Sequence, residues 1–319
     1  MGNEFDLIAT YFSRPAPARF LGVGDDCALL PVAPGMQLAT STDLLIEGRH
    51  FFSDVDPRAL GHKALAVNLS DLAAMGAQPL ACLLGLSIPR VDPVWLEAFS
   101  SGFYALADAA ACPLIGGDTT CSRSDVLISV TVFGQVDPLH ALRRNAAKAG
   151  DDIWVTGTLG GADIALRLML KTLPSNPALL EATRPFLEWP APPFELGQKL
   201  AGVAHAALDI SDGLVQDLGH ILKASGCGAI LDYAAIPTDP SLLGLPQALL
   251  QEAVLGGGDV YQLCFTALPA RREEILALAR QSTRRVSRIG CITAEHGLRV
   301  KDAAGQLICP LPVGFDHFA

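Results

Sequence analysis

The chain has 319 residues, of which half are hydrophobic and 18% are charged. This length is enough for two domains, each with its own core, and the composition is typical of a compact enzyme rather than a disordered or fibrous chain. The net charge of −10 argues against nucleic acid or an anionic membrane surface as a partner, because both require a basic face. An acidic protein that binds phosphate groups needs cations at the site.

The eight cysteines contain no CxxC pair, and most of them lie inside apolar runs. We therefore expect reduced, buried thiols rather than disulfides or a zinc site. Glu4 and Asp6 precede any apolar stretch, and no run reaches the length of a membrane-spanning helix. A cytoplasmic protein without a membrane partner is expected.

The first half of the chain alternates apolar runs with helical patterns. The runs predict strands at 36–42, 80–88 and 126–136. Asp56-Pro57 and Asp92-Pro93 each place a capping carboxylate before a proline, and apolar residues at helical spacing follow through Met75 and Ala110. Both pairs therefore predict the start of a helix.

A polar stretch at 138–149 predicts a linker between domains at 1–137 and 150–319. After it, the pattern predicts a strand at 152–156, a helix to Lys171 and an ordered, proline-rich surface excursion between helices. A helix from Asp212 to Ser225 should end at Gly226, and a hairpin is expected at 298–308. Because both halves mix strands and helices, the predicted class is α+β with mixed sheets flanked by helices.

Aspartates recur after apolar runs, where strand ends and turns are expected. They occur in Gly24-Asp25-Asp26, Ser41-Thr42-Asp43, Asn68-Leu69-Ser70-Asp71, Gly116-Gly117-Asp118 and Asp209-Ile210-Ser211-Asp212-Gly213. Each motif alone also fits a helix cap or a turn. If they converge, their like charges require metal ions, and hard oxygen ligands favour Mg²⁺. The chain lacks a P-loop, a complete dinucleotide fingerprint and HxxxH spacing, so a magnesium-nucleotide enzyme is predicted.

Five segments resemble thiamine-monophosphate kinase. They are Gly22 to Leu30, Ser41-Thr42-Asp43 with Gly48-Arg49-His50-Phe51, Lys63 to Gly76, Leu114 to Thr120 and Leu208 to Leu218. The resemblance extends from Phe5 to the terminal Phe315-Asp316-His317-Phe318. It implies an ATP-binding fold shared with aminoimidazole ribonucleotide synthetase, hydrogenase maturation factor and selenophosphate synthetase. It also implies a homodimer built across the N-terminal domains, which would bind ATP and metal.

The resemblance assigns roles to individual positions. The implied magnesium ligands are Asp26, Ser41, Thr42, Asp43, Asp71, Asp118, Asp209 and Asp212. The implied ATP contacts are Gly117, Asp118, Arg144 and Ser211. The implied substrate contacts are His50, Asp259 and Phe315, with the ring of Phe315 stacked on the thiamine heterocycle.

One segment departs from the family pattern. The usual Gly-Gly-Glu-Asp-Tyr-Glu-Leu is Gly257 to Leu263 here, so Asp259 replaces the substrate-binding Glu, Val260 replaces an Asp and Gln262 replaces a Glu. The departure concerns the thiamine contact and not the phosphate chemistry.

The expected reaction is in-line transfer of the γ-phosphoryl group of ATP to thiamine monophosphate, assisted by several Mg²⁺ ions. No obligatory base is expected, because the second pKa of a phosphate monoester is about 6 and the acceptor oxygen is already anionic. The alternatives are another ATP-dependent synthetase of the same superfamily, a metal-dependent phosphohydrolase, and a non-enzymatic acidic protein that binds cations.

Overall fold

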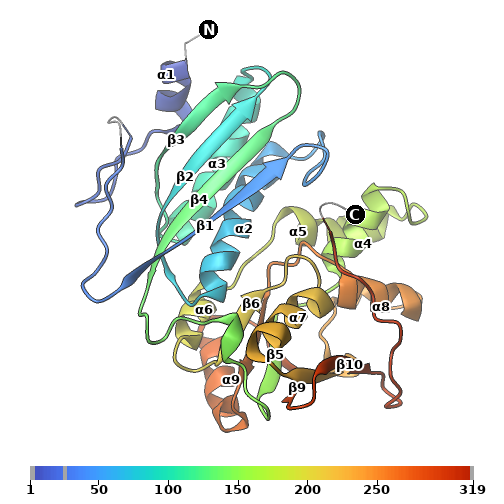
Figure 1. Ribbon diagram of the computed structural model, residues 1–319. Coiled ribbons are helices and arrows are strands. Elements are labelled where there is room, and N and C mark those ends of the chain that lie inside the picture. The colour runs from blue at the N-terminus through green and yellow to red at the C-terminus, as the bar shows by residue number, and fades with distance from the viewer. Residues whose placement is uncertain (1–3, 24–26, 317–319) are drawn as a thin grey trace. The chain divides into compact units, whose positions relative to one another are not determined.

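The structure, a computed structural model, describes residues 4–23 and 27–316, which form two compact units. The first unit includes the chain up to Leu72 and residues Ala77–Pro138. The second includes Ala73–Gly76 and the chain from Leu139 on. Each unit combines a β-sheet with helices (Figure 1), and the predicted α+β class is confirmed.

The sheet of the first unit has the strand order β1-β4-β2-β3 within the described residues. β2 and β3 are parallel, and the other neighbours are antiparallel. Helices α2 and α3 lie against one face of this sheet (Figure 1). The elements are α1 (Glu4–Leu7), η1 (Ile8–Phe12), β1 (Gln37–Ile46), α2 (Pro57–Ala74), β2 (Gln78–Ile88), α3 (Pro93–Ala109), β3 (Leu114–Cys121) and β4 (Leu127–Val136).

The two helices begin where the sequence predicts them. The Asp92 carboxylate accepts hydrogen bonds from the backbone N–H groups of Val94 and Trp95, at 3.1 and 3.2 Å, and Asp56 accepts one from Arg58 at 2.9 Å. A Cβ on Gly61 of α2 would lie 2.0 Å from the carbonyl oxygen of Phe99 in α3. The absence of a side chain at Gly61 therefore lets the backbones of the two helices approach closely.

The sheet of the second unit has the order β10-β7-β9-β5-β8-β6, with β7 and β10 parallel and the other neighbours antiparallel among the described residues. Its strands are β5 (Asp152–Thr156), β6 (Ala206–Asp209), β7 (Gly228–Asp232), β8 (Leu263–Ala267), β9 (Val286–Thr293) and β10 (Gly297–Lys301). Its helices are η2 (Arg144–Ala146), α4 (Gly161–Met169), α5 (Pro177–Glu188), α6 (Phe194–Leu200), α7 (Leu214–Ser225), η3 (Tyr233–Ala235), η4 (Pro240–Leu242), α8 (Gln247–Gly256), η5 (Pro269–Arg271) and α9 (Arg272–Gln281).

Strand β5 contributes to the core on both sides of this sheet. Ile153 and Val155 pack in a cluster with Leu214 and other residues of α7. Trp154 packs in a second cluster with Ile275 of α9. Side chains alternate between the two faces of a strand, so a fully buried β5 is expected to be apolar throughout its centre.

Two expected elements differ from the structure. The proline-rich stretch contains a twelve-residue helix, α5, whose start is marked by the Asn176-Pro177 pair, with the Asn176 side chain accepting a hydrogen bond from the Leu179 N–H at 3.1 Å. The expected hairpin at 298–308 forms only as a short return, with one antiparallel bridge between Lys301 and Leu307 and a 2.9 Å bond from the Ile308 N–H to the Val300 carbonyl. β10 also pairs in parallel with β7, which the local pattern did not predict.

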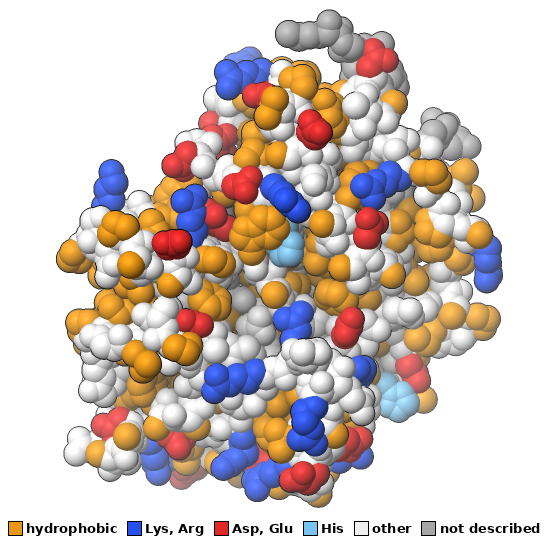
Figure 2. Space-filling model, turned by 180° about the vertical axis from the view of Figure 1, so that it is seen from behind, with side chains coloured by type: hydrophobic (Ala, Val, Ile, Leu, Met, Phe, Trp, Pro, Cys, Tyr) orange, Lys and Arg blue, Asp and Glu red, His pale blue; other side chains and the backbone are white. Residues whose placement is uncertain are grey.

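All eight cysteines lie within the described residues and are free thiols, but Cys27, Cys121 and Cys309 are exposed. The expectation that most are buried is therefore only partly correct. No helix in the described part of the chain is long and apolar enough to cross a membrane. On the face shown in Figure 2, acidic and basic side chains are interspersed among hydrophobic ones.

Candidate functional site

The first unit brings together oxygen-bearing side chains from β1 and α2. The Ser41 hydroxyl donates a 2.5 Å hydrogen bond to the Asp71 carboxylate. The backbone N–H of Asp43 donates to the side-chain oxygen of the buried Asn68 at 3.0 Å, and Asn68 is held in turn by a 3.1 Å bond to the carbonyl of Ala64. Because Ser41 and Asp43 share one face of β1, both lie on the side that meets α2.

The carboxyl group of Asp43 is electrostatically unfavourable when ionised. Burial, followed by the negative charge of Asp71, raises the pKa of Asp43 from 3.8 to about 6. A divalent cation between the two carboxylates would oppose both effects. The Asp43–Asp71 pair therefore has the donor chemistry of a magnesium site.

Thr42 and Asp118 face away from this pair. Thr42 Oγ1 lies 2.5 Å from Thr131 Oγ1 on the neighbouring strand, whereas Asp43 is paired with the buried Val130. Across the sheet, Asp118 of β3 is paired with Gly85 of β2, and Gly85 is paired with Ser129 of β4. Ser129 is paired in turn with Leu44 of β1. The alternation of side chains thus places Thr42, Leu44 and Asp118 on the outer face of the sheet, opposite α2 and α3.

Asp43 and Asp118 also lie in opposite edge strands, β1 and β3. Three strand spacings of about 4.8 Å separate these edges by about 14 Å. One copy of the sheet therefore does not bring the two carboxylates together. The expectation that they follow strand ends is wrong as well, because Asp43 lies inside Gln37–Ile46 and Asp118 inside Leu114–Cys121.

Gly117 and His50 have defined structural surroundings. A Cβ on Gly117 would lie 1.9 Å from the carbonyl oxygen of Leu84, so this position requires glycine. His50 lies in the turn after β1, where its Nδ1 accepts a 3.0 Å hydrogen bond from the Ile46 N–H. This bond leaves Nε2 as the nitrogen that can carry a proton in the neutral ring. Asp26, an implied metal ligand, lies outside the described residues.

In the second unit, the turn at 210–213 connects β6 to α7. One carboxylate oxygen of Asp217 accepts hydrogen bonds from the N–H groups of Ser211, Asp212 and Gly213, at 3.1, 3.0 and 3.0 Å. Burial raises the pKa of Asp217 to about 6, against the lowering effect of these three bonds. Asp217 thus fixes the turn that follows Asp209 and carries Ser211 and Asp212.

The segment that departs from the family pattern runs along this turn. The N–H of Asp259 donates to the carbonyl of Ser211 and that of Tyr261 to the carbonyl of Ile210, both at 2.8 Å. Asp259 and Tyr261 have positive φ values of 57° and 52°, and the Tyr261 hydroxyl donates to Asp259 Oδ1 at 2.9 Å. The Asp259 carboxylate is therefore oriented by a residue two positions away.

The C-terminal segment reaches the same turn. The N–H of Phe315 donates a 2.9 Å hydrogen bond to the carbonyl of Asp212. The Phe315 side chain is 41% exposed, which is unlike a core phenylalanine. The turn therefore gathers Ser211, Asp212, Asp259 and Phe315, which are separated by up to about a hundred positions in the sequence.

Arg144 does not join this group. Its carbonyl accepts a 2.8 Å hydrogen bond from the Ser225 hydroxyl, at the C-terminal end of α7. The twelve residues of α7 span about 18 Å, so the backbone of Arg144 lies far from the Ser211 turn.

Comparison with known proteins supports the resemblance over almost the whole chain. Residues 24–136 match the family model "AIR synthase related protein, N-terminal domain", and residues 148–303 match "AIR synthase related protein, C-terminal domain". Thiamine-monophosphate kinase of Salmonella typhimurium is 42% identical over 99% of this chain and 98% of its own length. The chain belongs to the thiamine-monophosphate kinase family.

Solved structures of this family have the same fold. A thiamine-monophosphate kinase from Stenotrophomonas maltophilia K279a has a TM-score of 0.83 and 44% identity, covering 90% of this chain and 92% of its own. AaThiL complexed with AMPPCP and TMP has a TM-score of 0.77 and 28% identity, covering 91% of this chain and 90% of its own.

The predicted ligands of this thiamine-monophosphate kinase family member are spread over two units and over both faces of one sheet. Accordingly, no group of three or more His, Cys, Asp or Glu side chains arranged to hold a metal occurs in residues 4–23 and 27–316. Asp217 and Tyr261 are not among the residues that the sequence motifs predicted. An acidic residue in the first turn of a helix is a signal for the role of Asp217, whereas nothing local indicated that Tyr261 would orient Asp259.

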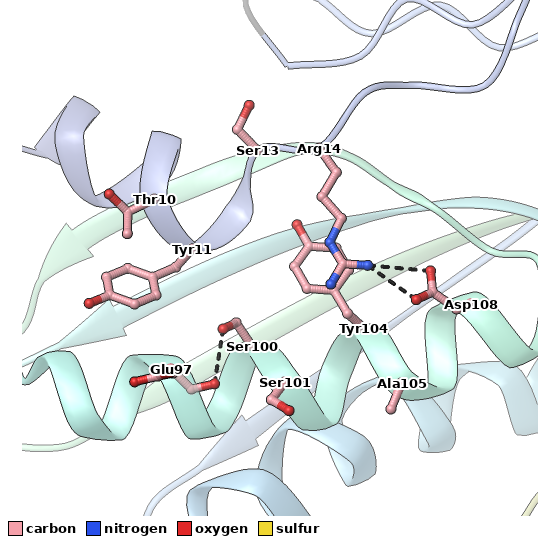
Figure 3. A pocket seen from close by; sticks show the side chains of 10 residues that line it. All are labelled: Thr10, Tyr11, Ser13, Arg14, Glu97, Ser100, Ser101, Tyr104, Ala105 and Asp108. Atoms are coloured by element: carbon pink, nitrogen blue, oxygen red, sulfur yellow. Dashed lines mark hydrogen bonds and ion pairs between the residues drawn. The ribbon is translucent and has the colours of Figure 1, made fainter.

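A surface pocket of about 460 Å³ lies elsewhere in the first unit, between the N-terminal segment and α3 (Figure 3). The guanidinium of Arg14 lies 3.5 Å from the ring centre of Tyr104 and 3.1 Å from the Asp108 carboxylate. None of the predicted site residues is among those that line it.

Proposed function

We propose that this protein transfers the γ-phosphoryl group of ATP to the phosphate of thiamine monophosphate, giving thiamine diphosphate and ADP. The observation that carries this proposal is the 42% identity to a thiamine-monophosphate kinase over nearly the full length of both chains. The AaThiL complex with AMPPCP and TMP supports the same pair of substrates.

The chain offers hard oxygen donors that fit Mg²⁺. The residues that would hold Mg²⁺ ions are Asp26, Ser41, Thr42, Asp43, Asp71 and Asp118 in the first half of the chain, and Asp209 and Asp212 in the second half. The fit rests on the donor set, because the hydroxyl of Ser41 and the carboxylates of Asp43 and Asp71 lie on one side of the sheet, and a cation would relieve the repulsion between the two carboxylates. When bound, Mg²⁺ neutralises phosphate charge and allows two polyanions to approach each other.

The remaining site residues bind and orient the substrates. Gly117, Arg144 and Ser211 contact ATP, with the Asp217 carboxylate keeping the Ser211 turn in place. Phe315 stacks on the thiamine heterocycle, and His50 and Asp259 bind polar groups of the substrate. No side chain has to remove a proton, because the acceptor phosphate, with a second pKa of about 6, is already anionic near neutral pH.

The protein functions as a homodimer built across the first units. The outer face of the sheet exposes apolar side chains, among them Leu38, Leu44 and Ile46 at 48%, 53% and 38%. Among the named strands of the described residues, β1 and β3 form the two edges of this sheet. In this dimer, the sheet of a second copy would pack on this face, and its edge strands would pair with β1 and β3. β3 of one protomer would then lie beside β1 of the other.

This arrangement would bring together two proposed metal ligands that one copy keeps apart. In such a dimer, the partner's Asp118 would lie at the edge of β1 on the outer face of the sheet, beside Thr42, whereas one copy alone keeps Thr42 about three strand spacings from its own Asp118. The two-fold symmetry then gives each dimer two equivalent sites.

The cytoplasm is the compartment that suits this protein. Its eight cysteines are free thiols, which fits a reducing environment, and its proposed co-substrate is ATP.

The deciding experiment incubates purified protein with ATP, Mg²⁺ and thiamine monophosphate and separates the products. We expect ADP and thiamine diphosphate in equal amounts, and no turnover when thiamine monophosphate is left out. ADP with free phosphate and an altered second substrate would instead indicate a synthetase, and ATP turnover without a second substrate would indicate a phosphohydrolase.

A further inference from the structure

Gln216, on the first turn of α7, connects two segments that the sequence separates by about a hundred residues. Its side-chain Nε2 donates to the carbonyl of Phe315 at 2.9 Å and to the Asp212 carboxylate at 3.3 Å. The N–H of Phe315 donates to the carbonyl of Asp212 at 2.9 Å. Three hydrogen bonds therefore link the proposed metal ligand Asp212, the amide of Gln216 and the backbone of Phe315.

The packing around Gln216 is close enough to fix this link. A Cβ on Gly314 would lie 2.6 Å from Gln216 Oε1 and 2.7 Å from the carbonyl oxygen of Asp212. A Cβ on Gly256 would lie 2.9 Å from Pro312. The C-terminal segment before Phe315 thus lies directly on α7 and on the end of α8, and its backbone has little freedom to shift without breaking the Gln216 bonds.

The chemistry of the amide suits both acceptors. An amide NH₂ group has two protons, so it can serve a carbonyl and a carboxylate at once without adding charge. A glutamate of the same length would turn acceptor oxygens toward Asp212 and the Phe315 carbonyl. A methionine of similar length would keep the packing and remove both donors.

From these contacts we propose that Gln216 is a positioning residue that holds Phe315 in place for the thiamine heterocycle, which rests on the proposed role of Phe315 in substrate binding. Gln216 does not touch the reacting atoms. It sets the backbone of Phe315 against the turn that carries Asp212, so the thiamine end and the metal end of the site keep one relative arrangement.

The test uses Gln216→Met and Gln216→Glu in the full-length protein, with Lys223→Met, an exposed position on the same helix, as the matched control. Loss of the bond to Phe315 should raise the KM for thiamine monophosphate about five-fold in Gln216→Met, and at least as much in Gln216→Glu. The KM for ATP and the melting temperature of Gln216→Met should stay close to those of the wild type. Lys223→Met should change neither constant.

A double mutant separates positioning of Phe315 from a general role. If Gln216 acts through the Phe315 ring, Gln216→Met should add no more than about two-fold to the thiamine monophosphate KM of Phe315→Ala. Full additivity would overturn the proposal, as would an unchanged KM in a stable Gln216→Met protein or an equal rise in both KM values. Failure of the wild type to form thiamine diphosphate would contradict the proposed function itself and is a separate result.

Discussion

The Asp43–Asp71 pair of the first unit and the Ser211–Gly213 turn of the second contain the same residue type under different constraints. The pKa of Asp43 is raised to about 6 by burial and by Asp71, two effects of the same sign. The pKa of Asp217 is also raised to about 6, but there burial and the charge of Asp212 oppose three backbone hydrogen bonds that favour the ionised form. A raised pKa therefore does not by itself distinguish a proposed metal ligand from a structural carboxylate. The backbone N–H groups that donate hydrogen bonds to the carboxylate do distinguish them.

The largest effect that would test this comparison is expected for Asp43→Asn. Removing the charge should lower kcat/KM by at least about 100-fold, because the site loses a metal ligand. The same change removes a buried charge beside Asp71, so the metal-free protein should be as stable as the wild type or more so. Activity assays and chemical denaturation measure the two effects.

Asp125→Asn, in the exposed loop before β4, is the matched control and should change neither quantity. Near-normal turnover of Asp43→Asn at limiting Mg²⁺ would remove Asp43 from the metal ligands.

The proposed dimer makes a prediction about mixed subunits. Asp43→Asn and Asp118→Asn homodimers should both be inactive. If the partner's Asp118 completes the site, a mixed dimer has one intact site and one with both changes. Random exchange of equal amounts makes about half of the dimers mixed, so about a quarter of wild-type activity should return.

Mixing Asp43→Asn with Asp71→Asn is the control, since both residues lie in one protomer and no intact site can form. Equal recovery in the two mixtures, or no recovery in a preparation shown to have exchanged subunits, would contradict the shared site.

For the second unit, Asp217→Ala should act mainly on stability. It leaves three backbone donors without their acceptor, and the free energy of unfolding should fall by about 3 kcal/mol. Asp239→Ala is a useful comparison, because the Asp239 carboxylate accepts one N–H bond, from Ser241 at 2.9 Å, and should cost about 1 kcal/mol. Equal losses in the two variants would show that the three bonds to Asp217 do not act together.

The pKa of Asp43 also predicts a pH dependence. Mg²⁺ requires the ionised carboxylate, so Mg²⁺ affinity in the absence of nucleotide should fall about ten-fold between pH 7 and pH 5. Because the folded-state pKa lies above the unfolded value of 3.8, the native state binds the extra proton, and metal-free stability should gain from this group as pH falls from about 7 to 4. Titration calorimetry and denaturation at several pH values measure both trends.

Asp43→Asn supplies the control, because its metal-free stability should lack the contribution of this group. An Mg²⁺ affinity that stays constant between pH 7 and pH 5 would indicate that Asp43 is not a ligand.

Local signals in the sequence predicted the elements that frame these sites. The Asp-Pro pairs mark the starts of α2 and α3, and Gly226, with a φ of 65°, ends α7 as expected. The same kind of signal, Asn176-Pro177, was present at α5 but was outweighed by the surrounding prolines. The parallel pairing of β10 with β7 joins segments about seventy residues apart, which no local pattern reports.

For the candidate site as well, some residues could be predicted from local motifs and others could not. Motifs identified Asp43, Asp71 and Asp212, but not the sheet register that places Asp118 on the opposite face and at the opposite edge. The roles of Asp217, Tyr261 and Gln216 depend on which backbone groups face them after folding. These contacts become visible only when residues far apart in sequence meet at one turn.

The smallest expected effect concerns Phe315 of the second unit. Its proposed contact with the substrate is a stacked ring, whereas the proposed contacts of the Asp43–Asp71 pair are made by charged groups. Phe315→Ala should raise the KM for thiamine monophosphate about five-fold and leave the KM for ATP nearly unchanged, because stacking of a ring on a cationic heterocycle contributes about 1 kcal/mol. Phe315→Trp keeps a flat ring and should be tolerated. The side chain is 41% exposed, so its loss should leave the melting temperature almost unchanged. A stable Phe315→Ala protein with an unaltered thiamine monophosphate KM would exclude this ring from the substrate site, and a fall in stability with both KM values raised would assign it a structural role instead.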